Sequence, residues 1–185
     1  MNKHALEHHL AQESITEALF QLMIQKPFSE INVTELVKKS GVARATYYRN
    51  YSSKEDILDK FFIQCLEAYD KKRPIRSLED IYSVEYVRDL IKSIDGLKSV
   101  FVLLKENNMS SYFLNLFNKH TTETIKKRGI DTLSEEDLYR IYAINGAEFN
   151  VVFNMIIEDI EVTPEMISRD IQNIYHRILK VQDQS

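Results

Sequence analysis

Apolar side chains recur every three or four residues along most of this chain, which is the period of amphipathic α-helices. In the first such segment, residues 10–26, one helical face would carry Ile15, Ala18, Leu19, Leu22 and Met23. Only 4 glycines and 3 prolines interrupt the pattern in 185 residues. The pattern predicts an all-α protein of about nine helices. They span residues 10–26, 35–40, 44–51, 53–69, 77–93, 97–105, 109–127, 134–158 and 163–181.

The two shortest of these helices, residues 35–40 and 44–51, are separated by a tight turn. Thr34 can cap the first helix, and Gly41 can adopt the left-handed conformation that ends it. Ala43, which precedes the second helix, has no side-chain group that could cap it. Two short helices joined by a glycine-containing turn form a helix-turn-helix, whose second helix enters the major groove of DNA.

The charge pattern changes the picture at the same place. The chain has a formal net charge of -4, yet Leu36 to Lys54 contains five cations and no carboxylate. Lysine and arginine release counterions from DNA phosphates, and Thr, Tyr and Asn side chains donate hydrogen bonds to phosphate oxygens. A solvated helix face would also carry such charges, but the flanking helix signals favour DNA binding.

The stretch PFSEINVTELVKKSGVARATYYRNYSSKEDIL resembles the DNA-binding region of the TetR/AcrR family of bacterial transcriptional regulators. The resemblance covers roughly residues 12–60. It rests on Gly41-Val42, Thr46, Tyr48, Tyr51, and Ser53-Lys54 followed by an acidic residue and Leu58. It implies a three-helix DNA-binding domain at residues 1–60 and a larger helical ligand-binding and dimerisation domain at residues 61–185.

Positions within the motif predict which side chains contact DNA. Arg44 opens the recognition helix and is the best candidate for a bidentate contact to guanine, whereas Ala45 offers only a methyl group. By the resemblance, Tyr48 meets the DNA backbone or a base, Tyr47 lies partly in the core, and Asn50 stands where the family often has His. Lys54 resembles a phosphate-contacting lysine of the family, and Tyr51 is expected to pack inside the domain. The predicted DNA-binding residues are Thr34, Arg44, Ala45, Thr46, Tyr47, Tyr48, Arg49, Asn50 and Lys54.

The expected helix at residues 134–158 has two polar residues on or beside its apolar face. Asn145 lies in the middle of that face and Glu148 near its side. Buried polar groups need partners, so either they make structural hydrogen bonds or they anchor a ligand in an apolar pocket. Glu148 would favour a cation in such a pocket. The predicted effector-binding residues are Phe101, Met109, Tyr112, Phe113, Phe117, Asn145 and Glu148. The aromatic residues and Met109 also suit an ordinary core, which we favour for any one of them.

The opposite side of the same helix carries small residues, which allow another helix to approach closely. They are Ala143, Gly146, Ala147, Asn150 and Asn154. With the last helix, which contributes Ile167, Ile171, Ile174, Tyr175 and Ile178, they predict half of a homodimer interface. That isoleucine stripe fits an intramolecular core equally well. A two-fold symmetric dimer predicts an operator that is an inverted repeat in double-stranded DNA.

Several classes of protein are excluded by what the sequence lacks. The single cysteine, Cys65, rules out an intramolecular disulfide and a four-cysteine metal site. No signal-peptide core and no run of ~18 apolar residues occurs, so we expect a cytoplasmic protein without a membrane partner. We also find no nucleophile–base pair, glycine-rich phosphate loop or metal-ligand spacing, so we expect neither an enzyme nor a cofactor.

Together these patterns predict a homodimeric, sequence-specific DNA-binding regulator. In the resembled family such a protein is most often a repressor that a small-molecule effector releases from DNA. The alternative is a DNA-bound adaptor or corepressor-type protein that responds to a protein partner and has no effector pocket.

Overall fold

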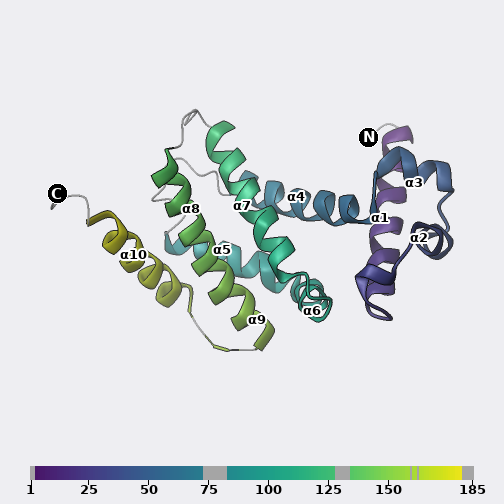
Figure 1. The fold of residues 1–185 in the computed structure, drawn as a ribbon. Helices are drawn as coiled ribbons and strands as arrows, with labels where there is room; N and C mark the ends of the chain where they lie inside the picture. Colours follow the sequence, from purple (N-terminus) through teal and green to yellow (C-terminus); the bar gives the residue numbers. More distant parts are fainter. Residues whose placement is uncertain (1–2, 73–82, 128–133, 159, 162, 181–185) are drawn as a thin grey trace. The chain divides into compact units, whose positions relative to one another are not determined.

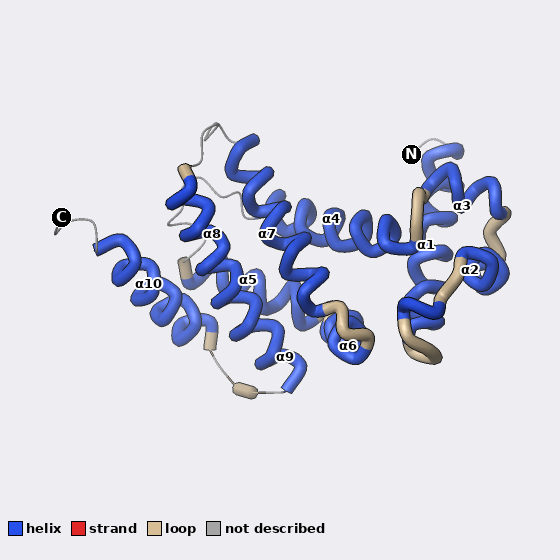
Figure 2. Tube along the Cα trace, viewed as in Figure 1, coloured by secondary structure: helices blue, strands red, loops and turns tan. Residues whose placement is uncertain are grey.

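A computed structural model describes residues 3–72, 83–127, 134–158, 160–161 and 163–180 of the chain (Figures 1 and 2). The chain divides into two compact units, residues 1–65 with 103–107 and residues 66–102 with 108–185. The division falls inside helix α4, close to the predicted boundary at residue 60.

Both units are built of helices in the part of the chain that the structure describes. The first unit contains α1 (Lys3–Met23), the 3₁₀ turn η1 (Phe28–Glu30), α2 (Val33–Ser40), α3 (Arg44–Asn50) and the start of α4 (Lys54–Lys72). The rest comprises α5 (Val84–Asp95), α6 (Lys98–Glu106), α7 (Ser110–Lys127), α8 (Glu135–Glu148), the π-helical turn η3 (Phe149–Phe153), α9 (Asn154–Glu158) and α10 (Pro164–Lys180). Taking the continuous rod α8–η3–α9 as one helix, the described residues form nine helices, which confirms the all-α prediction.

The first unit is held together by the apolar face of α1, which packs against α2 and α3. The predicted stripe on α1 is confirmed: Ile15, Ala18, Leu19, Leu22 and Met23 are all buried. Leu36 from α2 and Tyr47 from α3 are also buried in this unit. Each large apolar side chain removed from water contributes roughly 1.5–3 kcal/mol, so this core fixes the positions of α2 and α3.

The ends of α2 are set by local hydrogen bonds. Asn32, and not Thr34 as predicted, caps the helix: its Oδ1 accepts from the backbone N–H of Glu35 at 3.1 Å. The Glu35 carboxylate accepts in return from the backbone N–H of Asn32 at 3.2 Å. This reciprocal pair requires Glu three residues after the cap, and Asn32 alone has that spacing. Gly41 ends the helix with a φ of 68°, which confirms the predicted left-handed turn.

The second unit packs its helices around α8, which lies between α7 and α10 (Figure 1). A reciprocal cap between Ser134 and Asp137 starts α8. The predicted continuous helix at residues 134–158 is interrupted by η3, which no periodicity indicated. Of the helix predicted at 77–93, residues 77–82 lie outside the described residues, and α5 is described from Val84.

The isoleucine stripe of α10 is resolved at two positions. Ile167 and Ile171 are buried within the single chain, where α10 packs against α5 and α8, so these two belong to the intramolecular core. The side chains of Ile174, Tyr175 and Ile178 lie outside those described. None of the described helices has the length and apolar character needed to span a bilayer.

Candidate nucleic-acid interface

Helix α3 presents one face to solvent and the other to the core. Arg44, Ala45, Tyr48 and Arg49 are exposed, and Tyr48 retains 52% of its accessible surface. Ala43 makes no side-chain cap at the start of α3, as expected. Because the exposed residues are spaced at one, three and four positions, they form a single continuous face of the helix.

The guanidinium of Arg44 is fixed by two side chains of the first unit. Its Nη1 donates to Thr34 Oγ1 at 3.2 Å, and its Nη2 donates to Tyr48 Oη at 3.2 Å. The guanidinium carbon also lies 5.5 Å from the centre of the Tyr48 ring. Arginine has five N–H donors in a rigid fork, so three remain for acceptors on a ligand. Thr34 therefore lies at this surface as a residue that orients Arg44.

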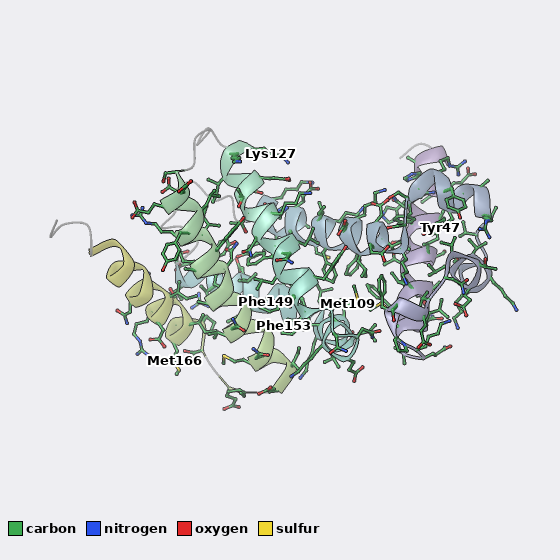
Figure 3. All side chains as sticks on the ribbon, viewed as in Figure 1. Tyr47, Met109, Lys127, Phe149, Phe153 and Met166 are labelled. Atoms are coloured by element: carbon green, nitrogen blue, oxygen red, sulfur yellow. The ribbon has the colours of Figure 1, made fainter. Side chains whose placement is uncertain are left out.

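Two residues predicted to bind DNA lie in the core instead. Tyr47 is completely buried (Figure 3), and its ring centre lies 5.2 Å from that of Tyr48 and 6.0 Å from that of Tyr51. Asn50 is 4% exposed, and its Nδ2 donates to the Thr46 carbonyl at 2.7 Å. Both side chains therefore lie in the core and not on the exposed face of α3. On α3 the buried residues 47, 50 and 51 lie on the arc that faces the core, and this arc borders the exposed one that carries Arg44 and Tyr48.

Burial also determines the chemistry of these side chains. The Tyr47 hydroxyl has no hydrogen-bond partner among the described residues, and burial raises its pKa to about 12. Tyr51 is buried as predicted, and burial raises its pKa as well, while a hydrogen bond with Thr16 opposes that shift. Both phenols stay neutral at physiological pH and act as core residues.

Lys54, the predicted phosphate contact, uses its ammonium elsewhere. Its Nζ donates to the carbonyls of Phe28 at 2.6 Å, Ile31 at 2.9 Å and Ser29 at 3.2 Å. The same ammonium lies 4.5 Å from the centre of the Phe28 ring. A lysine has three N–H donors, so all of them are engaged at the η1 turn. Lys54 thereby joins the start of α4 to the segment that leads into α2.

The η1 turn is held from a second side by Asn107, a residue that the sequence did not point to. Its Oδ1 accepts from the Phe28 backbone N–H at 2.7 Å. Its Nδ2 donates to the carbonyls of Met23 at 3.3 Å and Leu103 at 2.9 Å. Both the oxygen and the nitrogen of this side-chain amide have hydrogen-bond partners, so Asn107 fixes the corner between α1 and η1.

Lys60 is another residue missed from the sequence, and it supports the end of α3. Its Nζ donates to the Asn50 carbonyl at 2.5 Å and to Asp56 Oδ2 at 3.1 Å. It also lies 5.0 Å from the centre of the Tyr51 ring. Cations stabilise the negative end of the helix dipole, so Lys60 helps to hold the exposed face of α3 in place.

The exposed cations of this surface are Lys38, Lys39, Arg44 and Arg49, all from α2 and α3. No carboxylate occurs between residues 36 and 54 to neutralise them. This basic surface carries charge, aromatic rings and hydrogen-bond donors together. It has the chemistry to bind phosphates and the edges of bases.

The predicted effector-binding residues lie in the second unit, where they are mostly buried. Rings of Phe101 and Phe113 meet edge to face at 5.0 Å, and Phe113 stacks with Phe117 at 6.4 Å. Met109 is also buried and Tyr112 is half-buried. Phe149 and Phe153 extend the same cluster from η3 (Figure 3). The ring centre of Phe149 lies 6.0 Å from that of Phe113, and the ring centre of Phe153 lies 5.4 Å from that of Phe101.

The two polar residues of α8 differ in how they are satisfied. Asn145 is buried, and its Nδ2 donates to Asn118 Oδ1 on α7 at 3.0 Å, which is the structural hydrogen bond that we considered. Glu148 is 3% exposed, and its Oε1 has no hydrogen-bond partner among the described residues. Burial raises the pKa of this carboxyl to about 8.

Comparisons with known proteins agree with this arrangement. Residues 15–61 match the family described as bacterial regulatory proteins, tetR family. A comparison with curated protein sequences found no match.

Solved structures resemble the whole chain. A TetR transcriptional regulator from Rhodococcus sp. RHA1 has a TM-score of 0.55 at 17% identity, covering 97% of this chain and 100% of its own. The fatty acid degradation regulator FadR from Bacillus halodurans has a TM-score of 0.51 at 17% identity, covering 89% and 93%. The dihydroxyacetone kinase operon activator DhaS has a TM-score of 0.50 at 17% identity, covering 92% and 97%.

At this identity the structural likeness establishes the fold, and the match at residues 15–61 coincides with the helix-turn-helix of α2 and α3. Residues 15–61 of the chain therefore form a DNA-binding domain of the TetR family of bacterial regulatory proteins.

Proposed function

We propose that this protein is a homodimeric repressor that binds an inverted-repeat operator and is released by a small-molecule effector. The observation that carries the DNA-binding part is the orientation of Arg44. Thr34 and Tyr48 hold its guanidinium on the exposed face of α3, with three donors unused. An arginine held this way is suited to a bidentate contact with guanine O6 and N7.

The remaining contacts divide between bases and phosphates. Ala45, Tyr48 and Arg49 share the exposed face with Arg44, and Thr46 is half-buried beside them. These residues are proposed to face the major groove. Lys38 and Lys39, exposed on α2, are proposed to neutralise phosphates. Tyr47, Asn50 and Lys54 are left out of the proposed contacts, because the first two are buried and the third is engaged at η1.

Dimerisation is proposed to involve α8, where large apolar side chains face solvent. Tyr139 and Tyr142 are exposed there, and Val151 is exposed on η3, which continues the same rod. Gly146 lies on the same rod, and a Cβ added to it would meet no atom within 4 Å. Exposed aromatic residues beside a small residue suit close packing against the same helix of a second copy.

Two alternatives concern regulation. Close contacts among the phenylalanine rings of α6, α7 and η3 favour a filled core, and hence an adaptor that answers to a protein partner. The second alternative is that the protein activates transcription instead of repressing it, because one protein of similar fold is named an operon activator.

The direct test selects DNA fragments from a random library with the purified protein and measures binding by gel shift. We expect an inverted repeat to be enriched. Arg44→Ala should relax the choice at one base position in each half-site and weaken binding by ~1–3 kcal/mol. Lys92→Ala, which removes an exposed cation from α5, is the matched control and should bind as the wild type does. Failure to enrich any sequence, or equal binding by both variants, would contradict the proposal.

A further inference from the structure

Glu148 is a buried carboxyl group without an ionic partner among the described residues. It ends α8 and is 3% exposed, and none of the described cations forms an ion pair with it. Its Oε1 also lacks a hydrogen-bond partner among the described residues. Burying an unpaired carboxylate costs several kcal/mol, so such a group is usually paired or held neutral. The site therefore has an unsatisfied capacity for a cation.

The surroundings of Glu148 are aromatic. Burial raises the pKa of both Tyr69 on α4 and Tyr86 on α5, and a negative charge on Glu148 would raise each further, so both phenols lie within electrostatic range of this carboxyl. Tyr69 Oη donates to the Tyr86 carbonyl at 2.7 Å, and the two ring centres lie 5.0 Å apart. Phe149 follows Glu148 directly and contacts Phe153 and Phe113.

The other charges that act on these phenols are also acidic. Asp70 and Asp89 raise the pKa of Tyr69, and Asp70 raises that of Tyr86. His120 Nε2 lies 3.0 Å from Asp70 Oδ2, so a basic side chain faces one of these carboxylates. The carboxylates that act on Tyr69 and Tyr86 are thus all anionic when ionised, and their potential favours a positively charged ligand.

A second, independent feature lies at the same point of the chain. The helical rod changes from α to π geometry at Phe149, the residue after Glu148. Single π-helical turns are rare and occur frequently at functional sites. Here the turn places Phe149 and Phe153 with their rings 4.6 Å apart and stacked, next to the carboxyl-bearing residue.

We propose that Glu148, together with the rings of Tyr69 and Tyr86, is a binding site for a hydrophobic organic cation, such as an alkylammonium with an aromatic body. The inference rests on the proposed effector control and names the class of effector. The ammonium pairs with the Glu148 carboxylate and lies against the aromatic faces, as cations do in aromatic cages. The apolar body takes the place of contacts within the phenylalanine cluster, whose rings must separate to admit it.

Binding of such a cation moves one proton. At neutral pH the Glu148 carboxyl is protonated, because burial raises its pKa to about 8. Pairing with an ammonium favours the carboxylate, so the O–H bond breaks and the proton leaves to solvent as the ion pair forms. A quaternary ammonium has no proton to lose, so any proton released on its binding comes from the protein.

The test uses isothermal titration calorimetry on the full chain without DNA. The probe is (4-phenylbutyl)trimethylammonium, with 4-phenylbutanol and 4-phenylbutyrate as neutral and anionic controls. Titrations at pH 7 in two buffers of different ionisation enthalpy give the number of protons released. We expect close to one proton per cation bound, and affinity for the cation about tenfold or more above that for either control.

Glu148→Gln should abolish proton release and weaken cation binding about tenfold or more. Glu158→Gln, at an exposed position of α9, should behave as the wild type does. Equal binding of cation and alcohol, absence of cation binding, or proton release that persists in Glu148→Gln would overturn the inference. The comparison of the three probes uses the wild type alone, so it decides the question even if the variant does not fold. Operator binding is measured separately, and if it is intact while the cation fails to bind, only this inference is lost.

Discussion

The ammonium of Lys54 lies 2.6 Å from the carbonyl oxygen of Phe28, 26 residues earlier in the chain. The same Nζ donates to the carbonyls of Ser29 and Ile31, so these hydrogen bonds attach the start of α4 to the η1 turn. A phosphate would have to compete with these carbonyls for the ammonium. The structure therefore gives this lysine a role in positioning the helix-turn-helix instead of a free charge at its surface.

Lys54→Met keeps an unbranched side chain that is one atom shorter and removes the three N–H donors. Because buried carbonyls would lose their partner, we expect the free energy of unfolding to fall by about 1–3 kcal/mol, measured by urea denaturation. The slope of log K against log salt for DNA binding should stay unchanged. Lys38→Met, at an exposed cation of α2, should do the reverse, lowering the slope by about 1 without loss of stability. Unchanged stability with a lower slope for Lys54→Met would instead identify Lys54 as a phosphate contact.

Tyr47→Phe removes a buried hydroxyl that has no partner among the described residues. Its desolvation is uncompensated, so we expect the variant to be more stable than the wild type by about 1 kcal/mol. DNA affinity should not change, because the side chain is completely buried. Tyr51→Phe is the matched control: its hydroxyl bonds to Thr16, so that variant should lose stability. Weaker DNA binding by Tyr47→Phe at unchanged stability would show that the hydroxyl reaches DNA.

The helix-turn-helix was predictable because its signals are local. Helical period, the left-handed turn at Gly41 and the aromatic positions all lie within a few residues of the feature that they specify. The structure confirmed the turn and the burial of Tyr51. The structure also buries Tyr47, which the resemblance places partly in the core, and Asn50. Period alone does not separate Tyr47 from Arg44, because residues three positions apart are neighbours on a helix surface.

Contacts between residues far apart in the chain had no local sequence signal that could have predicted them. Lys54 and Asn107 bind backbone atoms of the η1 turn, and any residue type there would present the same carbonyls and amides. The π turn at Phe149 likewise depends on packing around the rod, and the sequence there shows only an ordinary apolar run. Thr34 was expected to cap α2, but a competing residue two positions earlier had the Glu partner that a reciprocal cap requires.

Gly146→Gln tests the proposed dimer interface on α8. A Cβ at this position meets no atom within 4 Å in the single chain, and glycine in a helix interior costs about 1 kcal/mol relative to alanine. We therefore expect the substitution to leave the fold intact while its long side chain blocks close approach of a second copy. Sedimentation equilibrium at micromolar concentration should show a dimer for the wild type and for Gly146→Ala, and a monomer for Gly146→Gln. A Gly146→Gln variant that stays dimeric would place the interface elsewhere.

The buried carboxyl of Glu148 makes stability depend on pH in a definite direction. Its pKa is about 8 in the folded protein and near 4.5 in the unfolded chain. Between these values the folded protein keeps a proton that the unfolded chain has lost. The free energy of unfolding therefore falls as pH rises, by roughly 1.4 kcal/mol per pH unit from this group alone. Below pH 4.5 and above pH 8 the contribution is constant.

Glu148→Gln removes this dependence, because the amide is neutral at every pH. We expect the stability of the variant relative to the wild type to increase by about 3 kcal/mol between pH 5.5 and pH 7.5, and then to level off above pH 8. Urea denaturation at pH 5.5, 6.5, 7.5 and 8.5 measures this difference, and other titrating groups cancel because both proteins share them. Glu158→Gln, at an exposed position, should show no such trend. If the difference between Glu148→Gln and wild type does not change with pH, Glu148 is ionised and paired in the folded protein, and the vacant carboxyl proposed to receive a cation does not exist.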